Sequence, residues 1–383
     1  MAAIRLGVEG WRFIPHSYAI VNQYQCAELA RRMDVRLCHR DLAYYRTDWA
    51  PQRGLLPPAV EQRSASLAAC AAGAPLDAVY RISQPLHFER EQENQFVFAT
   101  FENGGGLIDV LGWTSLEEAH RVSGATIITP SQWSKDGLIR FGAAAERIRV
   151  VPHGFDPTVF RPLPEPERAA IRRQFGLEGR FVFLSVGAMT ENKGMKALLR
   201  AFAAIAPTHP QAVLLLKGSD GLFPSHELLS QAMVETGTTH LEDRLIYTGE
   251  TRPLADVAGL LQIADCYLAP YRAEAFCMPV LEAAACGLPS IASGGGPTDE
   301  FTDPSFCLRI QGGAVDFPIA DTGFMGRELN PDPSHLANLM ARVVRDRGFR
   351  DGARQRGPAH VAGYTWEKVT DRLVAAIRET IGA

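Results

Sequence analysis

The sequence has few cysteines, no long apolar run and no excess of charge, and each absence excludes a class of protein. Seven cysteines in 383 residues show no CxxC spacing and no tight framework, which predicts reduced thiols in the cytoplasm rather than a disulfide scaffold. No apolar run approaches the length of a transmembrane helix, and the first residues lack the apolar segment of a signal peptide. The net charge of −4 gives no reason to expect a nucleic-acid partner.

The length of the chain predicts two domains, because 383 residues exceed what one ordinary core organises. A proline-rich segment at 156–180 has the composition of an interdomain linker. We therefore expect a first domain at 1–163 and a second at 164–364. An amphipathic helix at 365–383 is expected to pack back on the first domain.

Strand and helix patterns alternate through both predicted domains. The apolar run 4–8 is a buried first strand, and Ser17 is the expected N-cap of the helix after it. Ser115 and Ser131 are expected to cap two later helices, and residues 96–101 form another strand. This alternation predicts an α/β fold with parallel sheets. No GxGxxG is present, which argues against a dinucleotide-dependent dehydrogenase.

Four strand ends of the second domain carry glycines or a lysine. They are Gly187, Lys217 with Gly218, Gly249, and the triplet 294–296. In a parallel sheet these ends meet at one edge, where glycines allow close backbone approach and N–H groups can bind phosphate. Each glycine alone fits an ordinary turn, but their repetition favours an anionic ligand.

The stretch 271–287 combines two carboxylates with a buried helix. Glu274 and Glu282 are eight positions apart, Pro279 suits the first turn of the helix, and Gly287 ends it. Glu282 has apolar neighbours on both sides, where an unpaired carboxylate is costly, so we expect a paired or ligand-bound one. On these residues alone, a helix that begins after a surface glutamate remains an equal alternative.

Four segments together resemble the group 1 family of retaining, nucleotide-sugar-dependent glycosyltransferases. They are TPSQWSKDGLIRFG with IRVVPHGFDPTVFRP, VGAMTENKGMKALLRAF, YTGE with ADCYLAP, and the E-x7-E stretch with SIASGGGPTDEF. The resemblance is strongest from 125 to 300. It implies a GT-B fold, in which two Rossmann-like domains face a central cleft, with the donor on the second domain and the acceptor on the first.

The resemblance also implies roles for individual residues. Glu282 would accept hydrogen bonds from the ribose hydroxyls of the donor, Glu274 would contact the transferred sugar, and Lys193 would neutralise the diphosphate as it leaves. The implied donor-binding set is Gly187, Lys193, Lys217, the backbone of Phe276, Cys277 and Met278, Glu282 and Gly296. The implied catalytic residues are Glu274 and Lys193, and Glu102 is the candidate that this chain adds to them.

Two positions depart from the family pattern. The arginine that usually accompanies the lysine is replaced by Ala188 and Asn192, so the second cation is either missing or comes from elsewhere, with Arg272 and Lys217 as the candidates. The histidine that usually follows the strand FVFATFE is replaced by Glu102. This residue is either a general base for the acceptor, a hydrogen-bonding group of the acceptor pocket, or a polar residue at a strand end.

Two histidines of the first domain lie near these positions. His16 could touch phosphate or acceptor, although a structural or exposed role is the commoner one for a loop histidine. His153 is expected to shape the exit from the first domain.

The expected activity is transfer of a sugar, with retention, from a nucleoside diphosphate sugar to a hydroxyl acceptor in glycan or polysaccharide biosynthesis. No metal and no other cofactor is expected, since no DxD pair lies near the donor residues. The acceptor is a saccharide, a lipid-linked glycan or a small molecule, and a weak peripheral membrane contact stays open. The alternatives are a catalytically silent nucleotide-sugar-binding subunit of a glycan assembly complex, and an epimerase or phosphorylase of the same fold.

Overall fold

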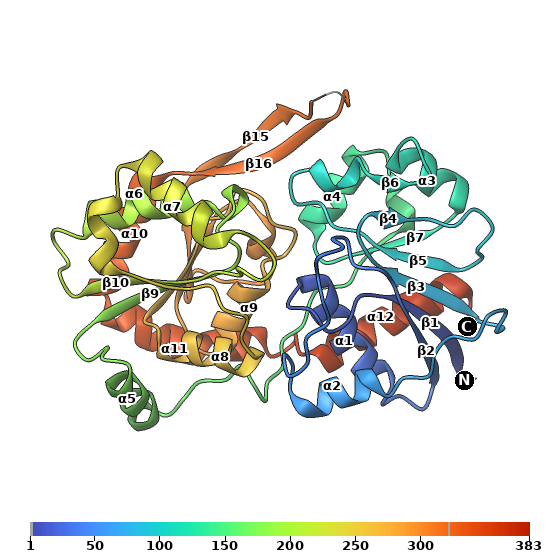
Figure 1. Cartoon of the computed structure of the whole chain (residues 1–383), viewed down its shortest axis with the longest axis horizontal. Coiled ribbons are helices and arrows are strands. Elements are labelled where there is room, and N and C mark those ends of the chain that lie inside the picture. Colours follow the sequence, from blue (N-terminus) through green and yellow to red (C-terminus); the bar gives the residue numbers. More distant parts are fainter. Residues whose placement is uncertain (1–2, 321) are drawn as a thin grey trace. The chain divides into compact units, whose positions relative to one another are not determined.

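The computed structural model describes residues 3–320 and 322–383 and divides the chain into two compact units (Figure 1). Unit 1 holds the chain up to Gly154 together with Asp316–Arg327 and Tyr364–Ala383. Unit 2 holds Phe155–Val315 and Glu328–Gly363. The expected domain limits at 163 and 364 lie near two of these boundaries, whereas the segment Asp316–Arg327 was not expected to leave the second domain.

Unit 1 is built on a six-stranded sheet in the order β2-β1-β3-β5-β7-β8, and all its strand pairs are parallel. The strands are β1 Ile4–Gly10, β2 Val35–Asp41, β3 Ala78–Ile82, β5 Gln95–Phe98, β7 Thr126–Thr129 and β8 Ile148–Val150. The helices are α1 Ser17–Leu29, α2 Pro58–Ala65, α3 Leu116–Ser123, α4 Gln132–Arg140 and α12 Trp366–Ile381. Short strands β4 Leu86–His87 and β6 Val110–Leu111 pair separately.

The helix starts of unit 1 follow their capping residues. Ser115 and Ser131 accept hydrogen bonds from backbone N–H groups of the first turns of α3 and α4, as predicted. The prediction for α1 is wrong by one residue, because Ser17 is its first helical residue and His16 is the N-cap. The Nδ1 atom of His16 accepts from the N–H of Tyr18 at 3.2 Å. The imidazole therefore caps the helix, a role that a hydroxyl or carboxylate usually has.

The strand expected at 96–101 is shorter, since β5 ends at Phe98. Beyond it the backbone turns to a side-chain partner, and the N–H of Phe101 donates to Ser134 Oγ at 2.7 Å. The loop that follows therefore begins earlier than the sequence indicates.

The C-terminal helix α12 belongs to unit 1 and closes its core. Leu373, Val374 and Ile377 are buried in one cluster with residues of β1, β3 and β5. Trp366 stacks on Tyr24 of α1 with ring centroids 5.0 Å apart. A helix far along the sequence thus completes the first Rossmann-like unit.

The expectation that all cysteines are reduced thiols is wrong for two of them. Cys38 and Cys70 form a disulfide. The segment after α2 returns beside β2, where the N–H of His39 donates to Ala68 O and the N–H of Cys70 donates to His39 O. This pairing of two distant stretches puts the two sulfurs together, and sequence spacing does not show it. The other five cysteines are free and buried.

Unit 2 repeats the architecture with a second six-stranded parallel sheet, in the order β11-β10-β9-β12-β13-β14. Its strands are β9 Phe181–Val186, β10 Ala212–Lys217, β11 Leu245–Thr248, β12 Cys266–Ala269, β13 Ser290–Ser293 and β14 Cys307–Ile310. Its helices are α5 Glu165–Gln174, α6 Met195–Ile205, α7 Ser225–Thr236, α8 Leu254–Ile263, α9 Met278–Ala285, α10 Pro333–Arg345 and α11 Arg347–Val361.

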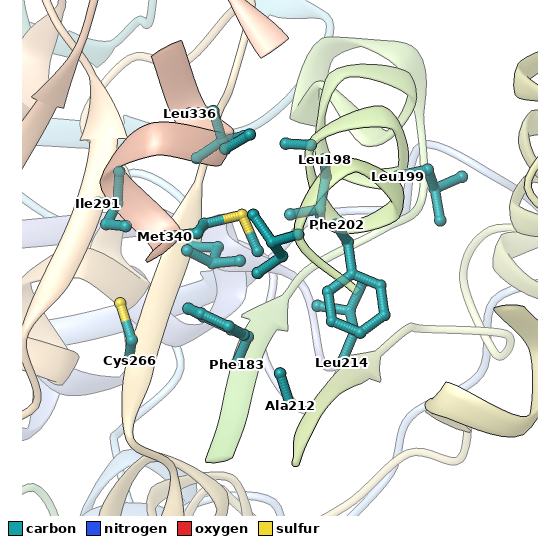
Figure 2. Close-up of a cluster of buried hydrophobic side chains, with 14 of the residues drawn as sticks. Phe183, Leu198, Leu199, Phe202, Ala212, Leu214, Cys266, Ile291, Leu336 and Met340 are labelled. Atoms are coloured by element: carbon teal, nitrogen blue, oxygen red, sulfur yellow. The ribbon is translucent and has the colours of Figure 1, made fainter. Parts of the chain in front are cut away.

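The core of unit 2 lies between its sheet and the pair α6 and α10. Figure 2 shows Phe183 and Leu214 of the central strands meeting Phe202 of α6 and Met340 of α10. These side chains recur at helical spacing on α6 and in continuous apolar runs on β9 and β10, which is the pattern of a doubly covered parallel sheet.

A hairpin of β15 Gly312–Pro318 and β16 Met325–Pro331 stands outside both large sheets (orange in Figure 1). The sequence analysis did not anticipate it. Its residues are glycine, proline and aspartate-rich and β15 is largely exposed, so neither strand propensity nor burial periodicity marks it.

No helix in the described part of the chain is both long and apolar enough to cross a lipid bilayer.

Candidate active site

The carboxyl edge of the unit 2 sheet gathers the loops that follow β9, β10, β11 and β13. All strand pairs of this sheet are parallel, so the four glycine- or lysine-bearing ends share one edge, as predicted. The E-x7-E stretch joins them, because it begins directly after β12 and contains α9. The edge of an open α/β sheet at which strands end is the usual place for a ligand.

Lys193 and Glu274 meet at this edge. Lys193 Nζ donates to Glu274 Oε1 at 2.5 Å, and both side chains are largely buried. The loop before α6 is fixed to the loop after β12 by backbone hydrogen bonds. The N–H groups of Arg272 and Ala273 donate to Asn192 O at 2.7 and 3.1 Å. The cation of one loop and the carboxylate of another are therefore fixed together.

Gly194 allows this close approach of the two loops. It has φ +72°, and a Cβ at this position would lie 1.8 Å from Pro270 O. Any side chain would force the loop after β12 away from the start of α6. The glycine that follows Lys193 is thus a geometric requirement of the pair.

Glu282 is buried on α9 with 8% of its surface exposed. It has no hydrogen-bond or ion-pair partner among the described residues, and burial raises its pKa to about 8. A carboxyl group of this kind destabilises the fold when it ionises. The sequence analysis expected a partner or a ligand here, and the residues that the structure describes supply no partner.

The start of α9 has an unusual backbone. Cys277 is the N-cap with φ 69°, a left-handed conformation that costs a non-glycine residue free energy. Phe276 stacks on Phe301 at 4.6 Å, and the chain enters α9 at Met278. The first N–H groups of a helix have no partner within it, so this turn is suited to an anion.

Lys193, Glu274 and Glu282 share one neighbourhood. The charge of each acts on the Cys277 thiol, whose pKa is raised well above its usual value chiefly by burial. Three of the residues singled out from sequence are therefore brought together around the N-terminus of α9.

Tyr271 ties the E-x7-E stretch to the glycine triplet and was missed by the sequence analysis. Its hydroxyl contacts Thr298 Oγ1 at 2.8 Å, and Ser293 Oγ donates to Tyr271 O at 2.6 Å. A Cβ on Gly296 would lie 2.6 Å from the Tyr271 hydroxyl, so the glycine is packed against this ring. Only the strand-end position of Tyr271 could have signalled its role.

The two candidate replacements for the missing arginine have partners of their own. Lys217 Nζ donates to Gly218 O at 2.5 Å, and burial lowers the pKa of this lysine. Arg272 forms an ion pair with Glu328 of β16. Gly187 lies close to Lys193, since a Cβ on Gly187 would be 3.9 Å from Lys193 Cε. The structure thus places Gly187 next to Lys193, whereas Lys217 and Arg272 are engaged with partners of their own.

In unit 1 the candidate residues lie after β5 and at the start of α1. Glu102 is exposed and near Tyr18. The Tyr18 hydroxyl contacts Thr100 Oγ1 at 3.1 Å. Burial raises the pKa of Tyr18 to about 12, and the charge of Glu102 adds to this shift. A carboxylate and a phenol therefore stand together at the carboxyl edge of the first sheet.

The two histidines of unit 1 that the sequence analysis considered, His16 and His153, have packing roles. His16 caps α1, and its ring centroid is 5.3 Å from that of Trp11. His153 lies between Phe98 and Trp366, and burial lowers its pKa to about 3. It is therefore neutral at ordinary pH and shapes the end of unit 1, as the sequence analysis expected.

No group of three or more His, Cys, Asp or Glu side chains that could hold a metal ion occurs in residues 3–320 and 322–383.

Curated relatives match part of the chain. A D-inositol 3-phosphate glycosyltransferase of Corynebacterium jeikeium is 29% identical over 254 residues, which cover 64% of this chain and 55% of that protein. A mannosylfructose-phosphate synthase of Agrobacterium fabrum is 30% identical over 170 residues, or 44% of this chain and 37% of that protein. The chain spans about half the length of the curated relatives it matches, or less.

Solved structures resemble the whole chain. The Anabaena protein HepE, crystallised with UDP and glucose, has a TM-score of 0.68 at 17% identity and covers 98% of this chain and 100% of its own. The sucrose-phosphate synthase of Thermosynechococcus elongatus has a TM-score of 0.69 at 20% identity, with 99% of both chains covered. At such identities the likeness shows the fold, and it confirms the predicted α/β class with two Rossmann-like halves of the GT-B type.

The model of the family described as glycosyl transferases group 1 matches residues 167–358, half of the chain. That stretch holds the Lys193–Glu274 pair, the buried Glu282 and the glycine triplet. This chain belongs to the family of glycosyl transferases group 1.

Proposed function

We propose that this chain transfers a sugar from a nucleoside diphosphate sugar to a hydroxyl group of an acceptor, with retention of anomeric configuration. One observation carries the proposal. A lysine–carboxylate pair and a buried carboxyl group without a partner converge on the N-terminus of α9. This is a set of groups for a ligand that combines negative charge with neighbouring hydroxyls.

Glu282 is assigned to the ribose of the donor. A carboxylate has two oxygens and can accept hydrogen bonds from two adjacent hydroxyls at once. Such bonds favour the charged form, so they offset the burial that raises the pKa of Glu282 in the empty site. The ligand would thus provide the partner that the protein lacks.

Lys193 is assigned to the diphosphate and Glu274 to the transferred sugar. As the bond from the anomeric carbon to the phosphate oxygen breaks, the nucleoside diphosphate gains negative charge, which the ammonium group stabilises. The N–H groups at the start of α9, from Cys277 and Met278, would contribute in the same way. Glu274 holds Lys193 in position and can accept hydrogen bonds from sugar hydroxyls.

Glu102 is proposed as the group that receives the proton of the acceptor hydroxyl. The acceptor oxygen forms the new bond to the anomeric carbon on the face from which the nucleoside diphosphate departs. Glu102 is exposed in the loop after β5, where an acceptor hydroxyl can approach it. The acceptor would be a saccharide, a lipid-linked glycan or a small molecule, and the reaction a cytoplasmic step in glycan or polysaccharide biosynthesis without a metal ion.

The structural neighbours suggest which donor to try first. HepE has been crystallised with UDP-glucose, which makes UDP-glucose the natural first member of a donor panel. The proposal itself does not depend on the base, because a ribose and a diphosphate are common to all such donors.

The test is a screen of UDP- and GDP-sugars that measures release of nucleoside diphosphate with and without candidate acceptors. Release that an acceptor stimulates, with a product of unchanged anomeric configuration by NMR, would support the proposal. Tight binding without turnover for every pair would favour a silent binding subunit. A donor returned with an altered sugar would point to an epimerase, and absence of binding would reject the site.

A further inference from the structure

The hairpin of β15 and β16 touches the loops of both candidate half-sites, although it belongs to neither sheet. Its base, Gly312–Val315 with Glu328–Pro331, is part of unit 2, and its tip, Asp316–Arg327, is part of unit 1. The contacts of the two parts can therefore be followed separately, each within its own unit.

The base of the hairpin is bound to the loop that positions Lys193. The N–H of Leu329 donates to Arg272 O at 2.7 Å, and the side chain of Glu328 pairs with the Arg272 guanidinium. The N–H of Arg272 in turn donates to Asn192 O. Strand β16 is thus two hydrogen bonds away from Lys193.

The base also fills the space beside the glycine triplet. Leu329 is 3% exposed, and its Cδ1 lies 2.8 Å from where a Cβ on Gly296 would be. Strand β16 therefore packs against the glycine triplet and shields it from solvent on this side.

The tip of the hairpin is bound to the loop that carries Glu102. The N–H of Arg327 donates to Asn103 O at 3.0 Å. Phe324 stacks on Phe141 with centroids 5.0 Å apart and rings inclined by 18°. Ile319 lies against Gly104, with its Cδ1 3.2 Å from the position of a Cβ there. The residues that follow Glu102 are glycine-rich, so these contacts limit a segment that would otherwise be free to move.

Consecutive residues of β16 make the two sets of contacts. The backbone of Arg327 holds Asn103, and the side chain of Glu328 holds Arg272. Arg327 and Glu328 are adjacent in the chain, so a change in the backbone of one restricts the backbone of the other. We infer that β16 is a positioning strand for the proposed reaction, with Phe324 and Glu328 as positioning residues that set the Glu102 loop according to the state of the donor loop.

This inference rests on the proposed function for its catalytic consequence, but its structural part can be tested without any donor. Hydrogen exchange of the unliganded full chain should show peptides covering 100–107 exchanging at least about fivefold faster in Phe324→Ala than in wild type. Phe324→Tyr keeps the stacked ring and should restore protection. Met325→Ala, which removes the exposed side chain of the residue directly after Phe324, is the matched control and should change nothing. Unaltered exchange at 100–107 in Phe324→Ala would overturn the inference.

The second arm uses Glu328→Gln and the donor–acceptor pair found in the screen. Exchange should rise at 190–196 and at 100–107 together, and turnover for transfer should fall about tenfold. The KM for the donor in Phe324→Ala should stay within about twofold of wild type, since its contacts are on the Glu102 side. If Phe324→Ala raises the KM for the donor and leaves turnover normal, a positioning role for Phe324 is rejected. If wild type turns over no donor, the proposed function fails while the exchange data still decide whether β16 links the two loops.

Discussion

The two sheets have the same architecture, but their carboxyl edges are held very differently. In unit 2 the ligand-facing loops are cross-linked by backbone and hydroxyl contacts, from Asn192 to Arg272 and from Tyr271 to Ser293. In unit 1 Glu102 is exposed, and the glycine-rich segment after it is restricted by the hairpin tip and by a hydrogen bond from Gln84 Nε2 to Gly106 O at 2.9 Å. A rigid edge suits a ligand part that never varies, such as a ribose with a diphosphate. A looser edge suits an acceptor that differs between relatives.

The largest expected effect probes the looser edge. Glu102→Gln should lower turnover by about a hundredfold or more, the range of a lost general base, while donor affinity is kept. Turnover and donor binding would be measured on the same preparation, with Glu93→Gln, an exposed glutamate of unit 1, as control. Normal turnover in Glu102→Gln would show that Glu102 takes no part in the chemistry. The reacting groups would then all lie in unit 2.

At the rigid edge Lys193→Ala should weaken use of the donor by about tenfold to a hundredfold, the loss of one charge-assisted contact. Steady-state kinetics with varied donor would show it. Lys196→Ala is the matched control, because Lys196 lies in the first turn of α6, three residues after Lys193, and pairs with Glu235 at 2.8 Å. Equal effects in both variants would mean that charge near α6, rather than the Lys193–Glu274 pair, matters.

A third prediction concerns the stability of the empty donor site against pH. The pKa of Glu282 is raised from 4.5 to about 8 by burial, so between these values the folded protein holds a proton that the unfolded chain releases. The stability from this group is complete below pH 4.5 and is lost as the pH rises through 8. Relative to wild type, Glu282→Gln should therefore gain stability with rising pH, by at most about 1.4 kcal/mol per pH unit.

Denaturant unfolding of both proteins without nucleotide, at pH values from about 5 to about 9, would test this. Glu227→Gln, an exposed glutamate of unit 2, should run parallel to wild type. A difference between Glu282→Gln and wild type that does not change with pH would show that Glu282 is not the buried acid described above.

The smallest expected effect concerns the backbone at the start of α9. Cys277→Gly should be more stable than Cys277→Ala by about 1 kcal/mol, because both remove the thiol but only glycine adopts φ 69° without strain. Thermal unfolding of the two variants would measure the difference. Equal stability would indicate that the turn at Cys277 changes its backbone conformation in the alanine variant. The carboxyl edge of the unit 2 sheet would then be less rigid than its hydrogen-bonded loops suggest.

The prediction from sequence was best where local pattern and sheet geometry agree. The strands β9, β11 and β12 are short apolar runs between punctuating residues, and their ends were placed at one edge because parallel strands allow nothing else. Glu274 and Lys193 were singled out through a family resemblance, and their direct pairing came only from the fold. Glu282 was predicted to need a partner. Its carboxyl group has none among the described residues, so a bound ligand stays the proposed partner.

The features that the sequence did not reveal depend on contacts between distant residues. Cys38 meets Cys70 because a loop returns beside β2, which no spacing rule encodes. The hairpin at 312–331 has exposed glycines and prolines where a strand pattern would need alternation. His16 caps a helix through its imidazole, although serine directly after it is the commoner cap. In each case tertiary contacts outweigh local preference.

The contact between Gly194 and Pro270 O also has a consequence for changing the enzyme by mutation. A library meant to redirect donor choice could vary Phe276, whose ring stacks on Phe301. At Gly194 every substitution places an atom where a carbonyl oxygen already stands. Variants at Gly194 would misfold before their donor specificity could be selected. Mutagenesis of this site should therefore leave Gly194, the residue after Lys193, unchanged.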